Sequence, residues 1–152
     1  MSHLVIVGGS DAGISAALHA RELDASTHVT LLVEDIFPNY SICGLPFYVS
    51  GEVPAVHLLA HRTQEEITNA GIDTLLAHTV LAVDPDAHRV TARDEKHQHK
   101  PVSYDHLILA TGARSRRLRM EGLDLPGVFL LHTMGTAWQC SSISQSMPRV
   151  PP

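Results

Sequence analysis

The chain has 152 residues, of which 44% are hydrophobic, and its formal net charge at pH 7 is −5, with a pI near 6.1. That size and hydrophobic content suit one globular domain with a buried core, and the acidic balance argues against nucleic acid or an acidic membrane surface as a partner. The apolar runs are too short to span a membrane, and two cysteines are too few for a secreted disulfide scaffold, so we expect a cytoplasmic protein.

A glycine-rich turn follows the first apolar run of the chain. Residues 4–7 predict a strand, residues 8–13 form the turn, and residues 14–23 have helical composition and spacing. A second predicted strand, residues 28–33, ends at Glu34, which lies 21 residues beyond the last glycine of the turn (34 − 13 = 21). This order is typical of dinucleotide binding, in which a pyrophosphate approaches the helix N-terminus and the acidic side chain accepts hydrogen bonds from a ribose.

One position departs from the dinucleotide pattern. Ser10 stands where the middle glycine belongs, so the backbone approaches the phosphates less closely. The alternative for Glu34 is a solvated surface carboxylate, which is what we expect of its neighbour Asp35. The candidate cofactor-binding residues of this region are Gly8, Gly9, Ser10, Asp11, Ala12, Gly13 and Glu34.

Cys43 is the candidate catalytic residue. Gly44, Leu45 and Pro46 follow it, and proline suits the first turn of a helix because its missing N–H costs nothing there. The N-terminal field of such a helix favours a thiolate, which would make Cys43 a nucleophile. An isolated cysteine is more often buried and inert, so the case for reactivity depends on the neighbouring motifs.

A short helix is predicted after the cysteine segment. Thr63 followed three residues later by Glu66 resembles a capping box, and Gly71 suits the end of the helix.

The next part of the chain predicts a small antiparallel excursion. Residues 73–84 predict one strand, residues 88–93 a returning strand, and residues 94–100 a polar hairpin tip. His97 and His99 in that tip lack further ligands nearby, so we expect them to face solvent and predict no metal site.

A second motif of small residues follows the predicted strand at residues 104–109. Small residues there let a backbone pass close to a bulky group. Four arginines at residues 114–119 predict a solvated basic loop, with attraction of a phosphate-bearing substrate as the alternative. Residues 128–131 predict a last strand, and residues 135–152 an irregular tail. The small residues of this motif are Ala110, Thr111 and Gly112.

Four landmarks together resemble the FAD-dependent pyridine nucleotide-disulfide oxidoreductases, in particular their single-cysteine branch of coenzyme A disulfide reductases and NADH oxidases or peroxidases. The landmarks are residues 8–13, Glu34, residues 41–48 and residues 107–113. The resemblance covers about residues 1–134. It implies an α/β, Rossmann-like FAD-binding domain of glutathione-reductase type with a small antiparallel β excursion. It also implies that Ala110, Thr111 and Gly112 are cofactor-binding residues, as the second motif that contacts the flavin.

The resemblance also implies a mechanism. NAD(P)H would reduce FAD, and electrons would pass to Cys43, which would cycle as a mixed disulfide with a small thiol or as a sulfenic acid. The implied partners are a small thiol or disulfide, peroxide or oxygen, and the full-length relatives are homodimers. Coenzyme A reductases carry a basic residue at the position of Glu22 and a polar one at the position of Ile42, so this chain differs from their pattern at both positions. Ser15 and Asn39 are compatible with polar contacts.

Length is the larger departure from the resemblance. We expect residues 1–134 to be an incomplete FAD-binding domain, because members continue into nicotinamide-binding and dimerisation domains, and we expect no activity from this chain alone. One alternative is a degenerate nucleotide-binding module without catalysis. The other is a flavoprotein reductase of the ferredoxin or rubredoxin type, which has no need of the Cys43 motif.

Overall fold

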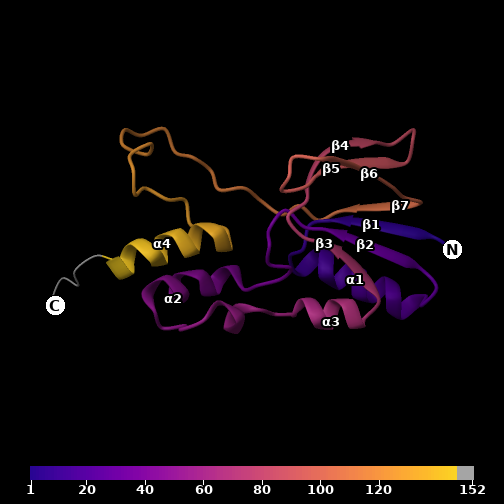
Figure 1. Cartoon of the computed structure of the whole chain (residues 1–152), viewed down its shortest axis with the longest axis horizontal. Helices are drawn as coiled ribbons and strands as arrows, with labels where there is room; N and C mark the ends of the chain where they lie inside the picture. The colour runs from indigo at the N-terminus through magenta and orange to yellow at the C-terminus, as the bar shows by residue number, and fades with distance from the viewer. Residues whose placement is uncertain (147–152) are drawn as a thin grey trace. The chain divides into compact units, whose positions relative to one another are not determined.

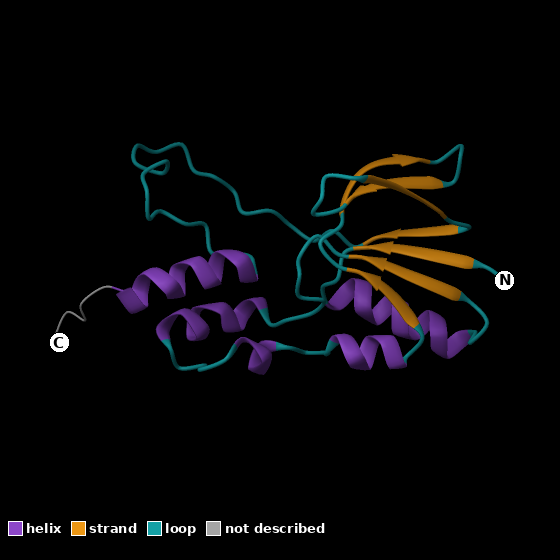
Figure 2. Ribbon diagram, in the orientation of Figure 1, coloured by secondary structure: helices purple, strands orange, loops and turns teal. Residues whose placement is uncertain are grey.

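A computed structural model of the chain describes residues 1–146, with side chains as far as residue 143. The chain divides into two compact units. The first comprises residues 1–40 and 61–112, and the second comprises residues 41–60 together with the chain from residue 113 onward. Figures 1 and 2 show the helices and strands of each unit.

A four-stranded parallel sheet is the centre of the first unit (Figure 1). Its strand order is β3-β2-β1-β7, so β1 lies between β2 and β7. The strands are β1 (His3–Val7), β2 (His28–Leu32), β3 (Ile72–Leu75) and β7 (His106–Leu109).

The parallel sheet is covered on both faces, which explains its continuous apolar strands. Alternate residues of β1 serve different cores. Leu4 and Ile6 pack with α1 (Asp11–Leu23) and α3 (Gln64–Asn69), whereas Val5 and Val7 pack with the antiparallel sheet. Full burial of one such side chain contributes about 1.5–3 kcal/mol. The antiparallel sheet has the order β4-β5-β6, with β4 (Thr79–Asp84), β5 (Arg89–Arg93) and β6 (His99–Ser103).

The second unit is built from helices. Its helix α2 contacts α4, and Leu45, Met134 and Ala137 are buried within the unit. Residues 113–133, which precede α4 in the chain, form no helix or strand. The helices are η1 (Ile42–Gly44), α2 (Leu45–Ser50), η2 (Val56–Leu59) and α4 (Met134–Ser146).

The local signals at helix ends are confirmed. Pro46 lies in the first turn of α2. The Thr63 hydroxyl accepts from the Glu66 N–H at 3.2 Å, and the Glu66 carboxylate accepts from the Thr63 N–H at 2.7 Å, which is the predicted capping box. Gly71 follows α3 with a φ of +75°, a conformation that favours glycine.

The prediction of one strand at residues 73–84 is wrong. The segment forms β3 and β4, which belong to different sheets, and the chain turns between them at Ala77, with a φ of 54°. The Ala77 N–H donates to the Asp35 carbonyl at 3.1 Å, and the His78 N–H donates to the Val33 carbonyl at 2.9 Å. Backbone bonds to a distant loop therefore stabilise a turn in an apolar run that contains neither glycine nor proline.

Two further strand predictions need correction. The polar tip predicted at residues 94–100 ends earlier, because His99 begins β6, a mostly exposed edge strand that contains Pro101. An edge strand tolerates proline and polar side chains because one of its sides needs no ladder bonds. Residues 128–131 form no strand in the described structure, and the Val128 N–H instead donates to the Leu125 carbonyl at 3.2 Å in a turn.

The prediction of an irregular tail fails over residues 135–146, which belong to α4, whereas residues 147–152 lie outside the described part of the chain. Among the α4 side chains that the structure describes, those up to residue 143, the buried ones are Met134, Ala137 and Ser141, spaced three and four residues apart on one helix face. Two of these three residues are small, so the sequence lacks the large apolar stripe that normally marks a buried helix face. The expected boundary of the FAD-binding domain at residue 134 stays a prediction.

None of the helices within residues 1–146 is long and apolar enough to cross a membrane. Over the same residues, no group of three or more histidine, cysteine, aspartate or glutamate side chains is arranged to hold a metal ion.

Candidate functional site

The glycine turn joins the C-terminal end of β1 to the N-terminal end of α1. Gly8 has a φ of +114°, and a Cβ added there would lie 2.7 Å from the Ala110 carbonyl carbon and closer still to its oxygen. A Cβ at Gly13 would meet the Gly8 carbonyl, whose carbon lies 3.0 Å away. The turn therefore packs backbone against backbone, both within itself and against the residue that follows β7.

The N-terminus of α1 has amides available for a ligand. Ser10 precedes the helix in an extended conformation, and its exposed side chain makes no capping hydrogen bond. The first amides of a helix have no intrahelical acceptor, and the helix dipole makes this end partly positive. A phosphate accepting from these amides fits the chemistry of the turn, even though a serine replaces the glycine of the usual pattern.

Asp11 in the first turn of α1 is held by two side chains. Its Oδ1 accepts from Asn39 Nδ2 at 3.1 Å and from His61 Nδ1 at 3.0 Å. These hydrogen bonds, first that from His61 and then that from Asn39, hold the pKa of Asp11 below its usual range. The carboxylate is therefore ionised at neutral pH.

Glu34 lies two residues beyond the end of β2 and is exposed. Its Oε1 is 3.5 Å from the Thr79 hydroxyl at the start of β4. An exposed carboxylate after the second strand, free of any ion pair in the described structure, can accept hydrogen bonds from ribose hydroxyls. Its role as a ribose ligand stays a prediction.

The Ala-Thr-Gly motif directly follows β7. The Ala110 N–H donates to the Val7 carbonyl at 2.8 Å, which continues the pairing of β7 with β1. Thr111 and Gly112 are exposed, and Gly112 has a φ of +64° with nothing within 4 Å of an added Cβ. Glycine is thus favoured there by backbone conformation, whereas at Gly8 the available space also requires it.

Three predicted elements come together at one edge of the sheet. The glycine turn, Glu34 and the Ala-Thr-Gly motif follow the carboxyl ends of β1, β2 and β7, which are adjacent parallel strands. The chain proceeds from β1 to β2 on one side, while β7 lies on the other, which makes this edge a topological switch point. Open α/β sheets bind their ligands at such points.

Cys43 lies in the second unit. It is exposed in η1, directly before α2, and both Cys43 and Cys140 are free thiols. A Cβ at Gly44 would lie 2.5 Å from Leu59 Cδ2, and Leu45 is buried, so the turn after the cysteine is closely packed. The thiol itself is open to an external reagent.

Two polar residues gain partners that the sequence analysis did not predict. Asn39 was considered for ligand contact, yet it is 3% exposed and donates to the Gly9 carbonyl at 3.4 Å as well as to Asp11. His61 was assigned no role, although its ring bonds to Asp11. Asp11 and His61 are 50 residues apart, and no motif connects them.

Glu22, which departs from the coenzyme A pattern, lines a cavity of about 230 Å³ in the first unit. The charged side chains around this cavity are two glutamates and one arginine, so an anion gains no net attraction there. The lining residues are Leu18, Glu22, Arg62, Glu66 and Ile67.

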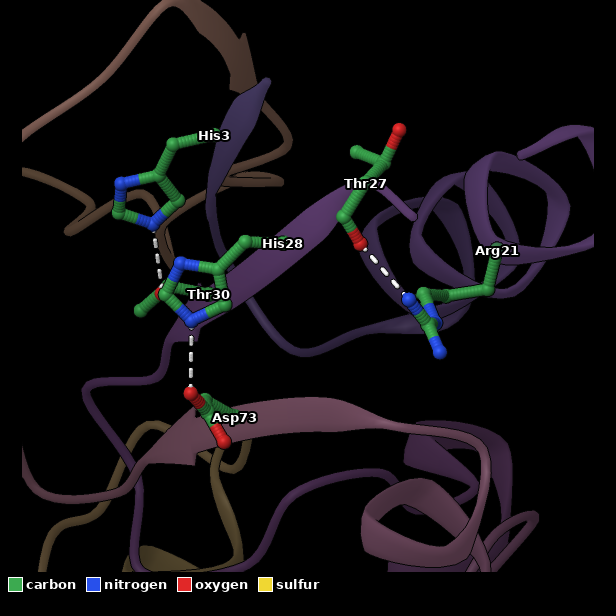
Figure 3. A network of polar contacts seen from close by, with 6 residues as sticks. All are labelled: His3, Arg21, Thr27, His28, Thr30 and Asp73. Atoms are coloured by element: carbon green, nitrogen blue, oxygen red, sulfur yellow. Dashed lines mark hydrogen bonds and ion pairs between the residues drawn. The ribbon is translucent and has the colours of Figure 1, made fainter. Parts of the chain in front are cut away.

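A separate polar network occupies the opposite, amino-terminal edge of the sheet (Figure 3). The rings of His3 and His28 stack with centroids 4.3 Å apart, and Nε2 of these rings lies 2.8 Å from Thr30 Oγ1 and Asp73 Oδ2, respectively. Burial, and then repulsion from His28, lowers the pKa of His3, while Asp105 and Asp73 act in the opposite direction. This network lies away from the carboxyl ends of the strands.

The family model described as pyridine nucleotide-disulphide oxidoreductase matches residues 2–145. The chain is 34% identical over 126 residues to an NAD(P)H sulfur oxidoreductase (CoA-dependent) of Pyrococcus abyssi, covering 83% of this chain and 28% of that protein. It is 35% identical over 144 residues to rhodocoxin reductase of Rhodococcus erythropolis, covering 95% of this chain and 32% of that protein.

Two solved structures also match nearly the whole of this chain. A water-forming NADH oxidase from Lactobacillus brevis matches with a TM-score of 0.86 and 25% identity, over 95% of this chain and 32% of that one. An NAD-dependent persulfide reductase from A. fulgidus matches with a TM-score of 0.87 and 27% identity, over 95% and 27%. The chain thus spans about a third or less of the length of these relatives.

Proposed function

Because the chain belongs to the pyridine nucleotide-disulphide oxidoreductase family, we propose that it is the FAD-binding part of an NAD(P)H-dependent oxidoreductase that passes electrons to Cys43. Proteins of this family are FAD-dependent enzymes that use NAD(P)H. The observation that carries the proposal is the meeting of the glycine turn, Glu34 and the Ala-Thr-Gly motif at the carboxyl edge of the sheet.

In this proposal the first unit holds the adenosine diphosphate half of FAD. The amides of Ser10, Asp11, Ala12 and Gly13 are available to phosphate oxygens, and the Glu34 carboxylate accepts from the ribose. Ala110, Thr111 and Gly112 supply a backbone without bulky side chains beside the turn. When bound, FAD supplies two-electron transfer from NAD(P)H.

The chemistry that we propose for Cys43 begins with attack of its thiolate on a sulfur of a small disulfide or persulfide. A bond forms between Sγ and that sulfur, the original sulfur–sulfur bond breaks, and its electron pair leaves on the departing thiolate. Two electrons, supplied in the complete protein by NAD(P)H, then cleave the bond between Sγ and the attacked sulfur. This regenerates the Cys43 thiolate, and one proton converts the released sulfur to a thiol. Peroxide is the alternative oxidant, since it would convert Cys43 to a sulfenic acid with release of water.

A second candidate is reduction of a small electron-transfer protein, which the similarity to rhodocoxin reductase favours. That function would not need the exposed thiol of Cys43. Substitution of Cys43 therefore separates the two candidates, because only the first loses turnover in the complete protein. The cytoplasmic location also stays a proposal, supported by the two free thiols.

The experiment that tests the cofactor site is calorimetric titration of the chain with FAD. Glu34→Arg should weaken binding by about 1–3 kcal/mol, the range for a hydrogen bond to a charged group. Glu95→Arg makes the same charge change at an exposed position in the turn before β6 and should leave the affinity unchanged. Equal affinities for the two variants would remove Glu34 from the site, and no FAD binding by the unaltered chain would remove the proposal.

A further inference from the structure

A single carboxylate oxygen joins two parts of the chain that are far apart in sequence. Asp11 Oδ1 accepts from Asn39 Nδ2 at 3.1 Å and from His61 Nδ1 at 3.0 Å. A carboxylate only accepts, so the Nδ1 atom of His61 carries the hydrogen. The same Nδ2 atom of Asn39, a buried residue, also donates to the Gly9 carbonyl at 3.4 Å.

Asn39 and His61 flank the segment that carries Cys43. The chain leaves the first unit after Tyr40 and returns at His61. Tyr40 and Ala60 each lie in an isolated β-bridge. Next to them the Ser41 N–H donates to the Leu59 carbonyl at 2.8 Å. Asn39 and His61, which flank residues 41–60 closely in the sequence, are the neck of this segment, and Asp11 bonds to both of them.

Phosphate binding does not explain a carboxylate at this position. Asp11 lies in the first turn of the helix whose N-terminus is the proposed phosphate site, and a negative charge there repels a phosphate. Its two hydrogen bonds lead instead to the neck. A carboxylate is also favoured at a helix N-terminus, which makes this turn a stable place for an anchor.

We propose that Asp11 is a positioning residue that clasps the neck of the Cys43 segment to the start of α1. One carboxylate at the start of α1 then holds the residues on both sides of the Cys43 segment. The relevance of this anchor to catalysis rests on the proposed function. The clasp itself depends only on the contacts of Asp11, Asn39 and His61.

The test is amide hydrogen exchange of Ser41, measured by NMR on the full chain. Asp11→Asn should accelerate this exchange about two- to fivefold, because exchange requires local opening and exposed charged pairs have modest strength. Asp73→Asn is the matched control. The side chains of Asp11 and Asp73 are both 71% exposed, and their histidine partners are 48% and 49% exposed. The control should leave the Ser41 amide unchanged.

A second pair of variants distinguishes the hydrogen bond from a general loss of stability. His61→Asn keeps a donor near the position of Nδ1 and should exchange like the unaltered chain, whereas His61→Leu should exchange as fast as Asp11→Asn. Unchanged exchange in Asp11→Asn, or equal acceleration in Asp73→Asn, would overturn the proposal. Loss of the redox role of Cys43 would not alter these rates, so the clasp and the proposed function fail separately.

Discussion

Replacing Gly8 with alanine tests how the glycine turn packs against the Ala-Thr-Gly motif. The positive φ of Gly8, +114°, is one that residues with a side chain rarely adopt. The new Cβ would also lie against the carbonyl group of Ala110, a residue whose backbone is held by donation of its N–H to the Val7 carbonyl. Two independent costs therefore fall on one substitution.

The expected loss of stability follows from those two costs. A residue held at an unfavourable φ costs about 1–3 kcal/mol, and overpacking against fixed atoms costs a further ~1–3 kcal/mol, so the sum is about 4 kcal/mol. Gly112→Ala is the matched control, because its φ of +64° is also positive but nothing lies within 4 Å of the added Cβ. That variant should lose only about 1–2 kcal/mol.

Urea unfolding followed by far-UV circular dichroism measures both variants. At a slope of about 2 kcal/mol per molar urea, the midpoint should fall by about 2 M for Gly8→Ala and by less than about 1 M for Gly112→Ala. FAD affinity should also fall in Gly8→Ala, since the turn must move to admit the Cβ. A midpoint for Gly8→Ala no lower than that of Gly112→Ala would refute the close packing on which the proposed site depends.

Two other predictions concern activity and pH. The chain supplied with FAD and NADH or NADPH should not oxidise the nicotinamide at about 1 per second or faster with oxygen, peroxide or a small disulfide as the acceptor. The reason is that flavin reduction needs a second nucleotide-binding unit to hold the nicotinamide. Turnover at that rate, abolished by Cys43→Ser, would contradict this prediction. Since the pKa of His3 in the folded chain lies below its ordinary value of 6.5, the unfolded chain binds a proton more readily, and stability should fall as pH drops below about 6.5. His3→Gln should reduce that slope in urea unfolding, and an identical slope would exclude His3 as its source.

The features that the sequence predicted correctly are encoded locally. The first strand, glycine turn and helix lie within about twenty residues, and hydrophobic periodicity marks each element. Thr63 and Glu66 are three residues apart, so their capping box needs no tertiary information. The meeting of Glu34 and the Ala-Thr-Gly motif at one sheet edge is not local in this sense, because it depends on the parallel pairing of both β2 and β7 with β1.

The features that the sequence analysis missed depend on contacts between distant residues. Ala77 turns the chain because loop carbonyls 42 and 45 residues earlier accept its N–H and that of His78 (77 − 35 = 42; 78 − 33 = 45). The helix α4 buries Ala137 and Ser141, whose small side chains carry little hydrophobic signal. The bonds of Asp11 to Asn39 and His61 span 28 and 50 residues. No periodicity or spacing rule covers such separations.

The central claim is that Cys43 exchanges electrons with FAD bound to the glycine turn. The direct measurement uses the FAD-loaded chain in a Cys140→Ser background, reduced without oxygen and then mixed with cystamine. The flavin absorbance should return, because each reduced flavin gives two electrons to one disulfide through Cys43 and yields two thiols. With Cys43→Ser added, the return should slow to the rate of free reduced FAD, whereas equal rates with and without Cys43 would contradict the account.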